Sequence, residues 1–242
     1  ASQQLQLNPD WEELHKKVCM NGYLSFETLG DTRHFSTIPL AYDMIYDYLQ
    51  QEYFDSEQFV KGIEGEMWAP PHPEGKKWAL GCFETMFKRL IENKLTRGGG
   101  LIGNWNMNEQ QSAMLYALAL DEDSTYKDGK GRAFYVNKLV YGPTTPSHGA
   151  YLDVLRANIS PTTGLWPEAP AGYGQGTIAQ LVRFGFIYYK NGLDFLAKDP
   201  LLSKAAGSMV QMLFPNGYVT NFGDASYSTM NTGQLELMMA YW

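Results

Sequence analysis

The chain has 242 residues, 44% of them hydrophobic and 14% aromatic, and carries a formal net charge of −7. This length and apolar content predict one globular domain with a sizeable core. The excess of acidic residues argues against a nucleic-acid partner or an anionic membrane surface. No apolar run is long enough to cross a bilayer, so the sequence predicts no transmembrane helix.

Apolar residues recur with the helical period of about 3.6 along most of the chain. Pro- and Gly-rich stretches interrupt this pattern, and a helix interior does not accommodate them. Asp199 followed by Pro200 is typical of a helix start. We expect about ten helices, over residues 10–29, 40–49, 55–68, 76–95, 104–120, 124–141, 148–158, 173–193, 200–213 and from 229 onwards.

The alternation of period 2 that marks strands is almost absent, so the sequence predicts an all-α fold. The helices alternate with short turns and with long Gly- and Pro-rich loops, which fits antiparallel helical hairpins packed side by side. No repeat of fixed period occurs, so a regular solenoid is not expected. The amphipathic pattern at the end of the chain, with Leu235, Leu237 and Trp242, carries no stop signal, and we expect a fragment of a longer protein.

Three polar loops flanked by aromatic residues stand at helix boundaries, at 103–109, 164–174 and 215–226. The second loop is the most informative, because it carries Trp166, Glu168 and Tyr173 within a few positions. Loops on a rigid scaffold are where binding and catalytic groups concentrate. In a ring of helical hairpins, every second helix boundary lies at the same end of the ring. We therefore expect the three loops to meet at one mouth of the ring.

Motifs for phosphate, nucleophilic and zinc chemistry do not occur: there is no Gly-rich phosphate loop, no serine nucleophile elbow and no paired-histidine zinc motif. Cys19 and Cys82 lie in apolar helical patterns typical of buried thiols, and the four histidines are scattered. The acidic run at 121–123 is typical of a solvated helix cap. We therefore expect neither a metal site nor a cofactor.

Four short motifs resemble those of one enzyme family and follow in that family's order. They are Ala41-Tyr42-Asp43-Met44-Ile45-Tyr46, Asn104-Trp105 opening an Ala- and Leu-rich helix, Trp166-Pro167-Glu168 followed by Tyr173, and Pro215-Asn216-Gly217-Tyr218 with Phe222-Gly223-Asp224-Ala225-Ser226. Together they span roughly residues 30–240 and are similar to the signatures of the heparinase II/III-like polysaccharide lyases.

This resemblance implies an incomplete (α/α) toroid followed by a β-sandwich domain. It also implies cleavage of a uronate-containing acidic polysaccharide by β-elimination. Residues 1–242 would then form the single toroid domain of a longer lyase, without the β-sandwich. The protein would act in the periplasm or as a secreted enzyme, on an acidic glycan and without a cofactor.

The resemblance further implies roles for individual residues. Tyr173 matches the catalytic tyrosine of the family, and Asn104 matches the residue that helps neutralise the uronate carboxylate. Trp105 stands where several relatives carry a catalytic histidine. To act as a base, Tyr173 would need a nearby positive charge or hydrogen-bond donors, which Arg97 or Arg183 could supply. The expected substrate contacts are Trp105, Trp166, Glu168, Arg183 and Asp224.

The residues themselves also allow structural roles. Tyr173 could be buried at a helix start, Asn104 could be a plain helix cap, and Glu168 could brace its loop by accepting backbone N–H groups. The two tryptophans could belong to the core rather than to a platform for sugars. Asp224 could brace a turn.

Two other functions remain open for the chain as a whole. One is a glycoside hydrolase on a similar helical toroid, which needs two carboxylates facing each other across a cleft. Glu168 and Asp224 are the loop pair that could serve. The other is a glycan-binding fragment without catalysis.

Overall fold

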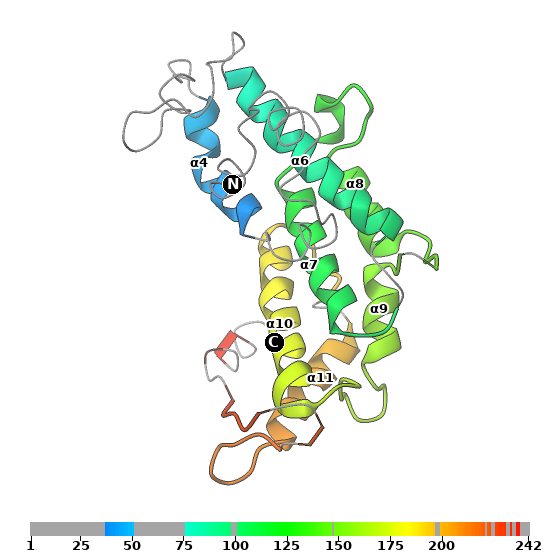
Figure 1. The fold of residues 1–242 in the computed structure, drawn as a ribbon, viewed down its shortest axis with the longest axis vertical. Helices are drawn as coiled ribbons and strands as arrows, with labels where there is room; N and C mark the ends of the chain where they lie inside the picture. The colour runs from blue at the N-terminus through cyan, green and yellow to red at the C-terminus, as the bar shows by residue number, and fades with distance from the viewer. Residues whose placement is uncertain are drawn as a thin grey trace, which may run out of the picture. The chain divides into compact units, whose positions relative to one another are not determined.

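The computed structural model describes residues 37–50, 76–97, 101–146, 148–196, 199–220, 222–223, 226–230, 233 and 236–237 (Figure 1). This part contains seven α-helices: α4 (Ile38–Gln50), α6 (Lys76–Arg97), α7 (Asn104–Leu118), α8 (Arg132–Tyr141), α9 (Tyr151–Asn158), α10 (Gln175–Lys190) and α11 (Pro200–Gln211). Two short elements accompany them, the 3₁₀-helix η2 (Asp123–Thr125) and the π-helix η3 (Pro170–Gly174). In the described ranges, β-pairing is confined to isolated bridges. The prediction of an all-α fold is confirmed.

Most expected helices occur where the periodicity places them, with ends that differ by a few residues. The side chain of Asp199 accepts the N–H of Leu201 at 3.0 Å, so this residue caps α11 as the sequence predicts. The helices expected over 10–29 and 55–68 lie outside the described residues. Among the helices that the structure describes, none has both the length and the apolar character that a membrane crossing requires.

The single helix expected over 124–141 is wrong in its first half, because a turn separates η2 from α8. Gly129 adopts a positive φ of 64°, which breaks the helical path. One carboxylate oxygen of Asp123 accepts the backbone N–H groups of Gly131 at 3.0 Å and Phe134 at 3.1 Å. The acidic run therefore contains the cap that the sequence predicts, and this cap sets the start of α8.

The chain divides into two compact units, residues 1–97 with 112–137 and residues 98–111 with 138–242. In the first unit α4 packs against α6. The ring of Tyr42 meets the ring of Phe87 edge to face, with centroids 5.1 Å apart, and Phe87 also contacts Tyr116 at 5.4 Å. Phe87 and Tyr116 are fully buried, so aromatic packing supplies much of this core.

In the second unit α10 packs against α11 and against η3, and Figure 1 draws α10 and α11 in neighbouring positions. Leu181 and Val182 of α10 are fully buried, as are Leu202 and Ala205 of α11. Because Ala205 is small, the two helices can approach closely. The loop before α10 is thereby held on a rigid helical pair, and it forms most of the site described next.

Candidate functional site

The loop that leads into α10 is anchored on α11. Gly164 has a φ of 75°, and a Cβ at this position would lie 2.5 Å from the carbonyl oxygen of Lys204. The carbonyl oxygen of Gly164 accepts the hydroxyl of Ser208 at 3.2 Å. Only glycine combines this backbone conformation with so close an approach to α11. The loop therefore begins at a fixed point on the scaffold.

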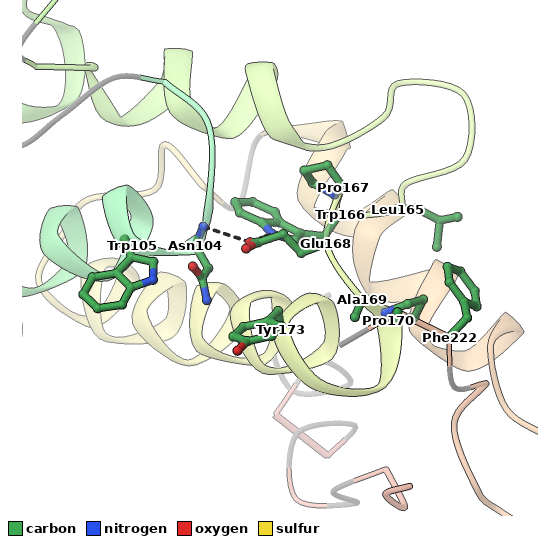
Figure 2. Close-up of a pocket in the computed structure, with 11 residues that line it drawn as sticks. Asn104, Trp105, Leu165, Trp166, Pro167, Glu168, Ala169, Pro170, Tyr173 and Phe222 are labelled. Carbon is green, nitrogen blue, oxygen red and sulfur yellow. Dashed lines mark hydrogen bonds between the residues drawn. The ribbon is translucent and has the colours of Figure 1, made fainter. Parts of the chain in front are cut away.

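Glu168 connects this loop to the start of α7. Its Oε2 atom accepts the backbone N–H of Asn104 at 2.9 Å and the indole N–H of Trp166 at 2.7 Å (Figure 2). The first N–H groups of a helix have no partner within the helix, and a carboxylate at that end is stabilised by the helix dipole. The bracing role that the sequence allows for Glu168 is thus present in the structure.

Asn158, at the end of α9, holds the same helix start from another side. Its Oδ1 atom accepts the N–H of Gly103 at 2.9 Å, and its Nδ2 atom donates to the carbonyl oxygens of Leu101 and Val154, both at 2.7 Å. Sequence reasoning missed this residue. The available signal was an asparagine inside an apolar helical pattern, since a buried amide must find hydrogen-bond partners.

A cavity of about 670 Å³ opens where these segments meet (Figure 2). The described residues that line it belong to the start of α7, to the loop 165–173 and to residues 222–223. Each of the three polar loops contributes to it, so the prediction that they share one mouth is confirmed. A concave site with aromatic walls and a few polar groups is the usual form of a small-molecule or sugar site.

Asn104 presents its side-chain amide to this cavity. The residue is 9% exposed, and its Oδ1 atom has no hydrogen-bond partner among the residues that the structure describes. Figure 2 shows the amide between the side chains of Trp105 and Tyr173. The capping alternative is wrong, because Asn104 is the first residue of α7 and its side-chain oxygen accepts no backbone N–H. A buried polar atom without a partner is rare in a folded protein and is a candidate contact for a ligand.

The two tryptophans differ in exposure. Both line the cavity, but Trp105 is 59% exposed whereas Trp166 is 4% exposed and has its N–H bound to Glu168. The burial of Trp166 favours the core role that the sequence left open. Trp105 has an accessible ring face, so it is the better platform for a sugar.

Tyr173 lies in η3, two residues before the start of α10, so the helix expected over 173–193 begins close to where the sequence predicts. It is 43% exposed and lines the cavity, which contradicts the alternative of a buried tyrosine. Within the described part of the chain its hydroxyl makes no hydrogen bond. The phenol is therefore accessible to a ligand in the cavity.

The remaining candidate residues do not join this group. Arg183 is exposed on α10, about ten residues or about 15 Å further along the chain than Tyr173, and is not among the described lining residues. Asp224 and the side chain of Arg97 lie outside the described residues. Phe222, which sequence analysis did not nominate, lines the cavity and is exposed.

The fold and the site define a helical protein with an aromatic-walled cavity built where loops meet at helix boundaries. In the part of the chain that the structure describes, no group of three or more His, Cys, Asp or Glu side chains is placed to hold a metal ion. Comparisons with protein-family models, with curated proteins and with solved structures give no match for this chain. Its function must therefore be argued from the site.

Proposed function

We propose that this chain is the helical toroid part of a polysaccharide lyase, similar to the heparinase II/III-like family, that cleaves a uronate-containing glycan by β-elimination. The observation that carries the proposal is that Asn104 and Tyr173 line the same cavity. These two residues come from separate loops, and the family's chemistry needs both. The motif order along the chain supports an incomplete toroid of helical hairpins as the arrangement.

The elimination breaks two bonds of the uronate residue and forms one. The carbon next to the carboxyl group loses a proton, the neighbouring carbon loses the glycosidic oxygen, and a double bond forms between them. The proton is only weakly acidic, so hydrogen bonds to the developing enolate charge lower the barrier. In this proposal the side-chain N–H of Asn104 donates such a bond. Tyr173 acts in both proton transfers: as a phenolate it takes the proton from the carbon, and the phenol so formed gives that proton to the leaving oxygen, which regenerates the phenolate.

The rest of the cavity suits a sugar. The exposed ring of Trp105 offers a flat apolar surface for the C–H face of a pyranose, and Phe222 offers another. Glu168 positions Asn104, because its Oε2 atom accepts the backbone N–H of that residue. We expect the protein to act in the periplasm or after secretion, where acidic polysaccharides are met.

A glycan-binding protein without catalysis is the second candidate, since exposed aromatic rings serve binding with or without turnover. The hydrolase alternative has less support, because Oε2 of Glu168 accepts two N–H groups and leaves only Oε1 for chemistry. Its partner carboxylate, Asp224, lies outside the described residues.

The test is a panel of uronate polymers, including alginate, hyaluronan, heparan sulfate and polygalacturonate. Elimination is followed by the ultraviolet absorbance of the new double bond, and binding is followed by tryptophan fluorescence. Tyr173→Phe removes only the hydroxyl, so we expect a loss of turnover of about 100-fold or more with binding retained. Tyr141→Phe is the matched control, because Tyr141 is also exposed but does not line the cavity.

Each outcome separates the candidates. Unsaturated products that disappear in Tyr173→Phe but not in Tyr141→Phe support the lyase. Products without the double bond would favour the hydrolase. Binding without turnover by the unmodified chain would favour the glycan-binding protein, and an absence of binding to every polymer would contradict both glycan functions.

A further inference from the structure

The segment that follows α11 folds back on itself as a short ladder. Val219 donates its N–H to the carbonyl oxygen of Ser228 at 2.9 Å, and isolated antiparallel bridges pair Leu213 with Val219 and Tyr218 with Thr229. The carbonyl oxygen of Met212 accepts both the N–H and the hydroxyl of Thr220, at 2.8 and 2.9 Å. These bonds connect Val219 and Thr220 to Ser228 and to Met212, the residue that follows α11.

The two faces of this ladder differ in character. Val219 is buried, and the hydroxyl of Ser228 donates to the carbonyl oxygen of Ala171 at 2.8 Å, so this face is attached to the loop of the cavity. Side chains alternate along extended backbone, so Tyr218 and Tyr227 lie on the other face. They are diagonal neighbours in the register that pairs Tyr218 with Thr229.

Tyr218 and Tyr227 together form what we call the tyrosine pair. Their ring centroids lie 5.5 Å apart with an interplanar angle of 61°, and the side chains are 38% and 69% exposed. Single exposed aromatic residues are normal on a protein surface. Two exposed rings that pack against each other differ from such single residues, because their side chains lose little conformational entropy when a ligand binds.

The tyrosine pair stands on a segment that also reaches the cavity. Phe222 lines the cavity and lies between the two tyrosines in the sequence. The neighbouring Gly223 lies close to the loop, since a Cβ there would be 3.4 Å from the Cβ of Ala169. In the view of Figure 2, Trp105 and Phe222 lie at opposite ends of the labelled side chains, with Tyr173 between them. The segment that carries the tyrosine pair therefore supplies one wall of the cavity.

We propose that the tyrosine pair is a second contact site for the glycan, which takes pyranose rings of the same polymer that lie outside the cavity. This inference rests on the proposed function. A pyranose has a C–H face that packs on an aromatic ring and hydroxyls at its edge, and a tyrosine offers an apolar ring with a polar tip. When one polymer molecule occupies both the cavity and the tyrosine pair, its affinity for the protein rises without new contacts in the cavity.

The test compares two ligands of the same repeating unit: the uronate polymer and the shortest oligosaccharide that the chain binds. Replacement of both tyrosines, Tyr218→Ala with Tyr227→Ala, should weaken binding of the polymer about tenfold, and leave binding of the short oligosaccharide unchanged. The single variant Tyr227→Ala, at the more exposed position, should show part of this effect. Tyr141→Ala is the control and should change neither affinity. Urea unfolding of each variant checks that the fold is retained.

Two results would overturn the inference while the proposed function stands. In one, the double variant binds the polymer as tightly as the unmodified chain, and the surface then serves another partner. In the other, both ligands lose affinity equally, and the tyrosines then support the cavity rather than contact the polymer. Failure of the unmodified chain to bind any uronate polymer would remove both proposals. This failure is distinguishable from the other two results, because it is measured on the unmodified chain and not on the tyrosine variants.

Discussion

The Oε2 atom of Glu168 accepts the backbone N–H of Asn104 at 2.9 Å, although the two residues are 64 positions apart in the sequence. The same oxygen accepts the indole N–H of Trp166 at 2.7 Å. One carboxylate oxygen thus joins the first turn of α7 to the loop before α10. Since Asn104 and Tyr173 approach the cavity from these two elements, their relative position depends on this contact.

Replacement of Glu168 by alanine should lower the free energy of unfolding by about 2 kcal/mol, because two N–H groups lose their acceptor. Glu168→Gln keeps an oxygen that can accept both bonds, so its loss should be smaller, about 1 kcal/mol. Urea unfolding measures both. Glu122→Ala is the control, since the exposed side chain of Glu122 makes no capping hydrogen bond, and it should change stability by less than about 0.5 kcal/mol. Equal stability of Glu168→Ala and the unmodified chain would contradict the bracing role.

The two tryptophans of the cavity should respond in opposite ways. Trp105→Ala should weaken glycan binding about tenfold, or ~1.4 kcal/mol, with little effect on stability, because the ring is exposed. Trp166→Phe should lower stability by about 2 kcal/mol, because it removes part of a buried indole and the N–H donor to Glu168. Titration by fluorescence and urea unfolding separate the two effects. If Trp105→Ala bound the glycan normally, its ring would not be the platform.

Gly164 and Gly176 should also show opposite effects when replaced by alanine. At Gly164 a Cβ would meet the backbone of Lys204 and the positive φ is strained, so Gly164→Ala should lower stability by more than about 2 kcal/mol. Gly176 is exposed in the first turn of α10 with open space around it, so Gly176→Ala should raise stability by about 0.5–1 kcal/mol. Thermal unfolding provides the comparison. A stable Gly164→Ala variant would show that the loop is not fixed on α11.

The pH dependence of stability should contain a contribution from Glu84 on α6. Burial raises the pKa of this carboxyl above its usual value, and the nearby Asp121 raises it further, while Lys88 and a hydrogen bond with Tyr126 act in the opposite direction. Because the folded chain holds this proton more tightly than the unfolded chain does, stability falls as the pH rises above the usual Glu range and through the raised pKa.

Glu84→Gln keeps the neutral form at every pH. We therefore expect it to match the unmodified chain at acidic pH, and to become the more stable of the two as the pH rises to neutral. Urea unfolding across this pH range measures the difference. Glu122→Gln, at an exposed position, should show no such divergence. A constant difference at all pH values would mean that Glu84 acts through packing rather than through its charge.

Local signals along the chain determined most of the helical structure. The period of apolar residues placed α6, α7 and α11, and Asp199 with Pro200 placed the start of α11. These features depend on neighbours within a turn or two, so they can be read from the sequence. Among the described residues, the error at 124–141 came from a glycine in a left-handed conformation and from an aspartate cap, both of which outweigh helical periodicity. The helix expected from 229 onwards is wrong at its start, because Thr229 pairs with Tyr218 in an antiparallel bridge.

The sequence also determined which loops carry the site, because aromatic, amide and carboxylate residues concentrate there at helix boundaries. The sequence alone could not assign roles to the individual residues of these loops. Only the tertiary structure shows that the amide of Asn104 and the phenol of Tyr173 line one cavity. It also shows that Trp166 is buried whereas Trp105 is exposed, and that Glu168 accepts the backbone N–H of Asn104. The physical reason is that exposure and hydrogen-bond partners depend on segments far apart in the chain, such as Asn158 and Gly103, which meet only after the helices pack.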